Sequence, residues 1–169
     1  DALLYSDGNI YAYAAAIGLS YDSIAIAQGA LVQSDNYDAG AYSTGAIVAQ
    51  ASAGHYSTAI ATGIQVLAYN GDATLESNNI GAYADAGYFS TAVATAAEVH
   101  ALYTASARNY GIVFAGATAG GYSQVGAYAM SVISDQGTAY LYSSDSIYAF
   151  AAAGYDSDAV AVGAVSVGP

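Results

Sequence analysis

The chain has 169 residues, of which 56% are hydrophobic, 13 are Asp or Glu and one, Arg108, is basic, so the formal net charge is -12. This charge argues against nucleic acid or an anionic membrane surface as a partner. With no Cys, the chain has no disulfides, thiolate metal ligands or thiol nucleophiles. With no Trp, three Phe and one Met, its apolar residues are mostly Ala, β-branched residues and Tyr, which predicts a thin core.

Alternating alanines predict the first kind of strand, near residues 9–17, 46–53, 79–86, 112–119 and 146–153. In each segment a β-branched residue precedes three alternate alanines. These sets are Ile10, Ala12, Ala14, Ala16; Ile47, Ala49, Ala51, Ala53; Ile80, Ala82, Ala84, Ala86; Val113, Ala115, Ala117, Ala119; and Ile147, Ala149, Ala151, Ala153. A period of two is typical of strands and outweighs the helix propensity of alanine.

A second kind of strand follows each of the first, near residues 23–32, 57–68, 90–102, 125–133 and 157–167. The first alanines of the earlier strands, at 12, 49, 82, 115 and 149, lie 37, 33, 33 and 34 residues apart. Those of the later strands, at 25, 59, 92, 127 and 159, lie 34, 33, 35 and 32 apart. Because two elements share one period, we predict a single repeat domain, 1–169, with repeats near 1–33, 34–69, 70–103, 104–134 and 135–169.

A glycine-aromatic turn joins the two strands, as in Gly54-His55-Tyr56-Ser57 and Gly87-Tyr88-Phe89-Ser90. We expect glycine to supply a positive φ at this corner. Stacked repeats would align one ring from each turn in a tyrosine ladder. Its members are Tyr21, Tyr56, Tyr88, Tyr122 and Tyr155. The longer connections between repeats, such as 104–109, are predicted to be loops.

Alanine faces allow two sheets to approach closely, which predicts an all-β fold of five strand-turn-strand repeats, stacked by parallel pairing as a β-solenoid or β-arch. The positions in step with the alanines end in Leu31, Leu67, Ile133 or Val165, so we expect a wedge that widens away from the glycine turn. The alternative is an antiparallel ten-strand sheet or barrel, which keeps the same alanine face. Alanine would not fill the lumen of a ten-strand barrel.

Acidic turns offer the oxygen ligands that Ca²⁺ prefers, at Asp7, Asp72, Asp156 and Asp158, although such turns are also typical of solvated Asx turns. His55 and His100 lie in different repeat contexts with no metal-ligand spacing. No nucleophile elbow or phosphate-binding glycine loop is present. We therefore predict no enzymatic activity, and no cofactor other than a possible divalent cation.

Two surface features complete the candidate sites. Arg108 is expected to pair with a nearby acid. An outward threonine array is of the kind used for ice binding, and exposed tyrosines favour an adhesive surface for cell-surface glycans. The threonines are Thr58, Thr62, Thr91 and Thr95.

The segments Ser57-Thr58-Ala59-Ile60-Ala61 and Ser157-Asp158-Ala159-Val160-Ala161 resemble the head repeats of trimeric autotransporter adhesins, whose period is shorter. The corner Ala53-Gly54-His55-Tyr56-Ser57-Thr58 resembles bacterial ice-nucleation repeats, and the strand-turn-strand stacking is similar to that of curli-type fibre subunits. These resemblances imply a secreted, self-associating β-repeat protein.

We therefore predict a non-enzymatic structural protein that assembles with itself, head to tail, into an extracellular fibre or surface layer; if it is secreted, Asp1 is a processed end. No distinct cap is expected at either end, and the last strand pair repeats the inward pattern of the first. The predicted assembly interface comprises Ile10, Ala12, Ala14, Ile147, Ala149, Ala151, Ala159, Val160 and Ala161. Because the net charge opposes association, acid or divalent cations should promote it. The alternatives are an outer-membrane β-barrel of five hairpins and an adhesive, glycan-binding or ice-binding solenoid.

Overall fold

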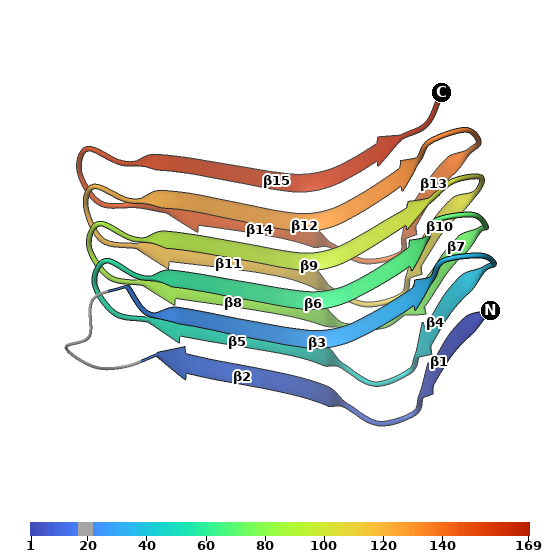
Figure 1. Cartoon of the computed structure of the whole chain (residues 1–169), viewed down its shortest axis with the longest axis horizontal. Helices are drawn as coiled ribbons and strands as arrows, with labels where there is room; N and C mark the ends of the chain where they lie inside the picture. The colour runs from blue at the N-terminus through green and yellow to red at the C-terminus, as the bar shows by residue number, and fades with distance from the viewer. Residues whose placement is uncertain (17–21) are drawn as a thin grey trace.

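The protein, described by a computed structural model over residues 1–16 and 22–169, is a coil of five turns with three strands in each turn. We call one turn a rung; Figure 1 shows the five rungs stacked one above another. Equivalent strands of successive rungs form three five-stranded sheets. Among the described residues no helix is present, and none is therefore available to span a membrane.

The strands of each sheet have similar lengths. Sheet 1 contains β1 (Ala2–Ser6), β4 (Ala39–Ser43), β7 (Ala73–Ser77), β10 (Ala105–Asn109) and β13 (Ala139–Ser143). Sheet 2 contains β2 (Ile10–Ala16), β5 (Ile47–Ala53), β8 (Ile80–Ala86), β11 (Val113–Ala119) and β14 (Ile147–Ala152). Sheet 3 contains β3 (Ile24–Ser34), β6 (Thr58–Ala68), β9 (Thr91–Ala101), β12 (Gln124–Ser134) and β15 (Asp158–Val167).

Parallel, in-register pairing holds neighbouring rungs together. Ala49 pairs with Ala12 on one side and with Ala82 on the other, so each alanine column of the sequence becomes a column in space. The predicted β-solenoid is confirmed. The antiparallel ten-strand alternative is wrong, because every described strand pair is parallel.

Sheet 1 was missed by the sequence interpretation, which assigned 104–109 to a loop. Ala105 and Ala107 are buried, whereas Ser106 and Arg108 point outward, so this segment alternates as a short strand. With two or three inward positions per strand, the pattern is too short and too polar to stand out from a loop. Each repeat thus has three strands, and the third closes the wide side of the wedge between sheets 2 and 3.

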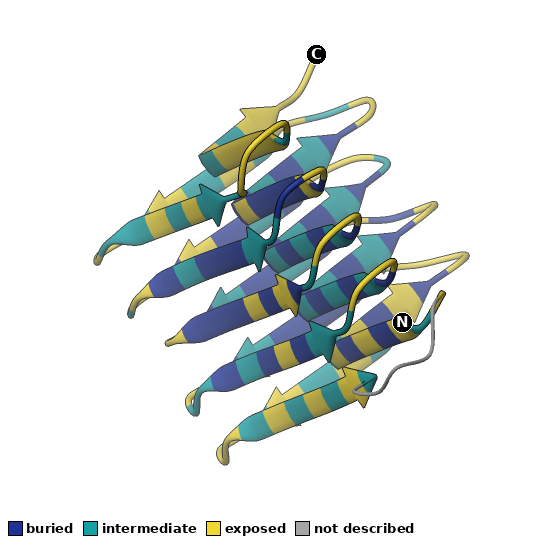
Figure 2. Ribbon diagram, turned by 90° about the vertical axis from the view of Figure 1, so that its left-hand side faces the viewer, coloured by how far each residue is buried: buried dark blue, intermediate teal, exposed yellow. Residues whose placement is uncertain are grey.

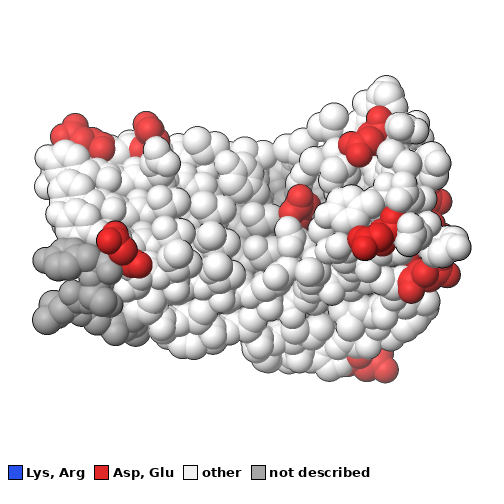
Figure 3. Space-filling view, viewed as in Figure 1, with Lys and Arg blue, Asp and Glu red and all other residues white. Residues whose placement is uncertain are grey.

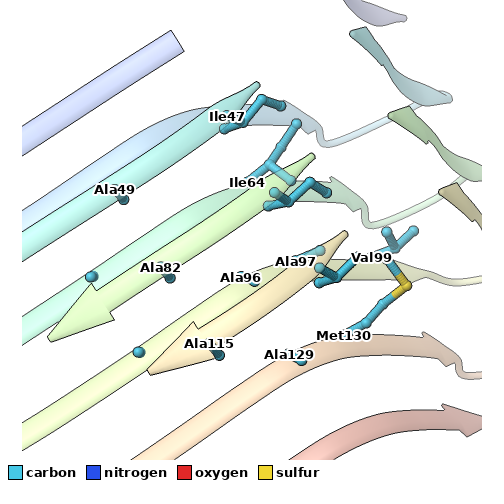
Figure 4. Close-up of a cluster of buried hydrophobic side chains, with 14 of the residues drawn as sticks. Ile47, Ala49, Ile64, Ala82, Ala96, Ala97, Val99, Ala115, Ala129 and Met130 are labelled. Carbon is cyan, nitrogen blue, oxygen red and sulfur yellow. The ribbon is translucent and has the colours of Figure 1, made fainter. Parts of the chain in front are cut away.

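The core narrows toward the corner between sheets 2 and 3 and widens toward sheet 1. Alanines such as Ala49, Ala82 and Ala115 fill the narrow part, and Ile64, Val99 and Met130 fill the wider part (Figure 4). Because alanine side chains are small, facing strands can approach closely in the narrow part of the core.

A bend in each sheet 3 strand reverses which residues face the core. Ala96 and Ala97 are both fully buried although they are adjacent, and Ala96 is left out of the strand register on both sides. Equivalent bends fall at Gly29, Gly63, Ala129 and Gly163. Because all five strands bend at the same position, they keep their register while the alternation of inward and outward residues shifts by one.

This shift corrects one prediction. The large residues predicted to face the core at the wide end of the wedge lie on the outer face instead. One of them, Leu31, is half exposed. The others are Leu67, Ile133 and Val165. The larger inward residues are instead one position earlier, such as Val66 and Val132, which are fully buried.

The corner between sheets 2 and 3 also differs from its predicted chemistry. None of the described glycines has a positive φ. The left-handed residues are Asp22, Tyr56, Phe89, Tyr122 and Asp156. Glycine is needed at this corner for space: a Cβ on Gly154 would lie 2.6 Å from the backbone nitrogen of Gly121 in the rung below.

Candidate assembly interface

The first and fifth rungs expose inward-facing positions that the middle rungs bury. Ile147, Ala149 and Ala151 on β14 are partly buried, whereas the equivalent Val113 and Ala115 on β11 are fully buried. On β2, Ile10, Ala12 and Ala14 are likewise partly buried. Figure 2 shows the dark buried stripes concentrated in the middle rungs.

The two ends are stepped because sheets 2 and 3 are offset. Strand β3 contacts β5 as well as its own neighbour β2, and β6, β9 and β12 likewise lie between two sheet 2 strands. Strand β15 contacts only β14 from sheet 2, which leaves Ala159 and Ala161 exposed, while Ala25 and Ala27 on β3 are buried. At the other end β2 projects beyond β3, as Figure 1 shows. The two steps have complementary shapes.

Val160 differs from the other predicted interface residues, because it lies on the outer face of β15. It pairs with Gly126 in the rung below, where the same column contains Val93 and Ile60. Its side chain would therefore contact a neighbouring copy along the rim rather than in the core.

Large apolar side chains are concentrated on the outer faces of the two end rungs. Tyr5, Tyr11 and Tyr13 are each about two-thirds exposed or more on the first rung. Tyr142, Tyr148 and Phe150 occupy the same positions on the fifth. The middle rungs place Glu76, Arg108, Gly81, Gln50 and Gly116 among these positions. In these three columns the end rungs are therefore aromatic throughout, whereas the middle rungs mix these residues with Tyr42, Tyr83 and Phe114.

A serine ladder runs through the corner between sheets 2 and 3, and the sequence interpretation did not identify it. The backbone N–H of Ser57 donates to Ser90 Oγ at 3.1 Å, and that of Ser90 donates to Ser123 Oγ at 3.1 Å. Ser23 and Ser157 continue the ladder at its two ends. The signal was a serine at 23, 57, 90, 123 and 157, one in each repeat.

The predicted tyrosine ladder is present in part, with one position corrected. Tyr56, Phe89 and Tyr122 stack with ring centroids 4.9 and 4.8 Å apart and planes within 2°. Tyr88 instead contacts His55, at 5.5 Å, and Tyr155 meets Tyr122 edge-on at 4.9 Å. Tyr21 lies outside the described residues. In every rung of the stack the ring belongs to the left-handed residue directly before the corner serine. In the third rung that residue is Phe89 and not Tyr88.

The calcium candidates lie at three different corners of the coil. Asp7 is between β1 and β2, Asp72 precedes β7, Asp156 lies at the corner before β15, and Asp158 is the first residue of β15. Asp72 Oδ1 accepts a hydrogen bond from the backbone N–H of Thr104 at 2.8 Å. Within residues 1–16 and 22–169, no group of three or more His, Cys, Asp or Glu side chains is placed to hold a metal ion. The structure therefore does not gather these four carboxylates into one site.

Surface charge lies mainly at the corners rather than over the strands. In Figure 3 the acidic side chains gather toward the two ends of the view, with few over the middle. Arg108 pairs with Glu76 at 3.3 Å, as expected for a local ion pair, and His100 contacts Asp135 at 3.0 Å. The threonine array holds Thr58 beside Thr91 and Thr62 beside Thr95 on sheet 3, but Ile24, Gln28, Gln124 and Tyr128 occupy the adjoining rungs.

Comparison of the chain with protein-family models, curated proteins and solved structures found no match. The function is therefore argued from the geometry of the coil and its two ends.

Proposed function

We propose that the chain is a non-enzymatic structural protein whose copies stack head to tail, the fifth rung of one on the first rung of the next, in a secreted fibre or surface layer. The supporting observation is that these two rungs carry identical residues at six of the nine equivalent positions in residues 4–12 and 141–149. The pairs are Leu4 and Leu141, Tyr5 and Tyr142, Ser6 and Ser143, Ile10 and Ile147, Tyr11 and Tyr148, and Ala12 and Ala149. Stacking in register would place like residues over like, as parallel β-stacks do.

On the outer faces, this contact would add aromatic stacking between the two copies. Inside the chain, Tyr5 already stacks on Tyr42 at 5.0 Å with planes 11° apart. At the junction Tyr142 would meet Tyr5 of the next copy and Tyr148 would meet Tyr11. Each ring pair would contribute about 0.5–1.5 kcal/mol beyond the burial of its apolar surface.

The stepped ends support a single polarity of growth. The exposed face of β15, with Ala159 and Ala161, would pack against β2 of the next copy just as β3 packs against β5 within the chain. Two identical ends would not complement each other in this way, so the contact is head to tail and generates an open filament. The net charge of -12 would oppose it, so acid or a divalent cation such as Ca²⁺ should favour assembly.

Engineered disulfides test the register directly, because the natural chain has no Cys. With Tyr11→Cys and Tyr148→Cys in one chain, the two thiols would lie on adjacent strands of different copies, with Cα atoms ~4.8 Å apart and within disulfide range. Within one chain three rungs separate them. Oxidation should give a ladder of covalent multimers on a denaturing gel.

The matched control is Tyr13→Cys with Tyr148→Cys, which displaces one thiol by two residues, ~7 Å along the strand. It should give few multimers. Equal ladders from both variants, or none from either, would contradict head-to-tail stacking in register. Electron microscopy of the unmodified protein should show filaments whose width is that of one coil.

A second candidate function is adhesion to a neutral glycan, favoured by a shallow groove of about 250 Å³ on sheet 2. Tyr83 and Phe114 stack there at 4.9 Å, with Phe150, Gln50 and Asp85 beside them. Aromatic faces with adjacent hydrogen-bonding groups suit sugar rings. Tyr83→Ala should abolish retardation in gels that contain hydroxyethylcellulose, whereas Tyr128→Ala, with a similarly exposed ring on sheet 3, should not. Equal retardation of both variants would exclude this groove.

A further inference from the structure

One column at the corner between sheets 2 and 3 changes from aromatic to acidic at both ends of the chain. It contains the left-handed residues Asp22, Tyr56, Phe89, Tyr122 and Asp156, with φ between 50° and 64°. In the middle rungs the rings of this column lie 4.8 to 4.9 Å apart. Head-to-tail stacking would therefore bring Asp156 of one copy to about this distance from Asp22 of the next.

The register pairs no other acidic side chain with an acidic side chain at the junction. Asp158 would lie beneath Ile24, and Asp145 beneath Gly8 of the next copy. Asp1 and Asp7 of the next copy would lie above Thr138 and Ser144. The Asp22–Asp156 pair is thus the one direct contact between acidic side chains that the stacking creates.

Neither carboxylate of this pair has a hydrogen-bond or ion-pair partner within the described part of the chain. This contrasts with Asp38 and Asp72, which are also stacked. Asp38 Oδ1 accepts the backbone N–H of Asp72 at 2.9 Å, and Asp72 Oδ1 accepts that of Thr104 at 2.8 Å. Stacked aspartates in the coil are thus stabilised by backbone donors, which the terminal pair lacks.

The other titratable groups around the pair do not neutralise it. On the Asp156 side these are Asp158, Tyr155 and Tyr122, of which Asp158 adds negative charge. On the Asp22 side, within residues 22–169, they are Tyr56 and His55, and His55 Nδ1 accepts the backbone N–H of Tyr88 at 2.9 Å. The single Arg is held by Glu76 on sheet 1.

We propose, building on the head-to-tail stacking above, that Asp22 and Asp156 form an electrostatic gate that makes stacking depend on pH. At neutral pH the two carboxylates repel each other across the junction. Protonation of either removes the repulsion, so stacking takes up protons and strengthens as the pH falls.

The test compares isosteric substitutions that each remove one negative charge. Asp156→Asn removes the gate, and asparagine tolerates the left-handed backbone. The control, Asp85→Asn, changes the net charge equally on the third rung, far from the junction. For each protein, sedimentation measures the critical concentration for assembly between about pH 4 and about pH 7.5 at fixed ionic strength.

We expect Asp156→Asn to lower the critical concentration about fourfold or more at neutral pH, and to weaken its dependence on pH. Asp85→Asn should follow the unmodified protein. An equal effect of both variants, or no effect of Asp156→Asn on a pH-dependent assembly, would overturn the gate alone. Failure of the unmodified protein to assemble at any pH would overturn the proposed function, and the gate with it.

Discussion

Ser90 Oγ accepts a hydrogen bond from the backbone N–H of Ser57, one rung below, at 3.1 Å. The same hydroxyl donates to the carbonyl oxygen of Tyr88 at 2.9 Å. One buried side chain thus satisfies a donor of the neighbouring rung and an acceptor of its own rung. This exchange adds to the backbone bonds between rungs at the corner, such as that from the N–H of Thr91 to the carbonyl oxygen of Ser57 at 3.0 Å.

Ser90→Ala should destabilise the coil by about 1–3 kcal/mol, because the buried N–H of Ser57 would lose its acceptor. Chemical denaturation measures the free energy of unfolding. The control is Ser106→Ala, at an outward position of β10 where no hydrogen bond to the side chain is present in the described structure. That variant should change stability by less than about 0.5 kcal/mol. A similar loss in both would mean that the ladder does not stabilise the corner.

The bend at Gly63 is tested by two isoleucines of β6. Ile60 and Ile64 are four residues apart and would share a face in a regular strand, but Ile64 is fully buried and Ile60 is on the outer face. Ile64→Ala should therefore cost about 2–5 kcal/mol, and Ile60→Ala clearly less. Equal losses in the free energy of unfolding would mean that the strand alternates without a bend.

Phe89 lies between two rings in the aromatic stack. Phe89→Leu keeps a side chain in the left-handed conformation but removes both ring contacts, so it should lower stability by about 1–3 kcal/mol. Tyr103→Leu, at an exposed ring outside the stack, serves as the control and should be nearly neutral. Thermal unfolding at matched concentrations compares the two. An unchanged midpoint for Phe89→Leu would show that the stack contributes nothing.

The Arg108–Glu76 pair should contribute little, because both side chains are at least one-third exposed. Arg108→Leu is expected to change the free energy of unfolding by less than about 0.5 kcal/mol at moderate salt. Repeating the measurement in ~1 M NaCl, where surface charges are screened, should bring the variant and the unmodified protein still closer. A loss above about 1 kcal/mol would indicate a structural role for this guanidinium.

Repetition in the sequence determined the stacking of the coil. The sheets lie too close together at the alanines 12, 49, 82, 115 and 149 for a larger side chain to fit across the core. Only in-register stacking, which places alanine over alanine, therefore packs this part of the core. The same reasoning located the exposed positions of the end rungs. Both conclusions follow from side-chain size and from the repeat period alone, and they need no knowledge of the backbone path.

Only the tertiary structure decided the features that depend on how the backbone turns. The strand Ala105–Asn109 is too short for its alternation to stand out, and the bend at Ala96 reverses a parity that the sequence suggests should continue. The choice of Phe89 over Tyr88 for the aromatic stack rests on one left-handed residue. A left-handed residue at a corner or a bend within a strand redirects a side chain, and neither alters the repeat period from which the sequence was interpreted.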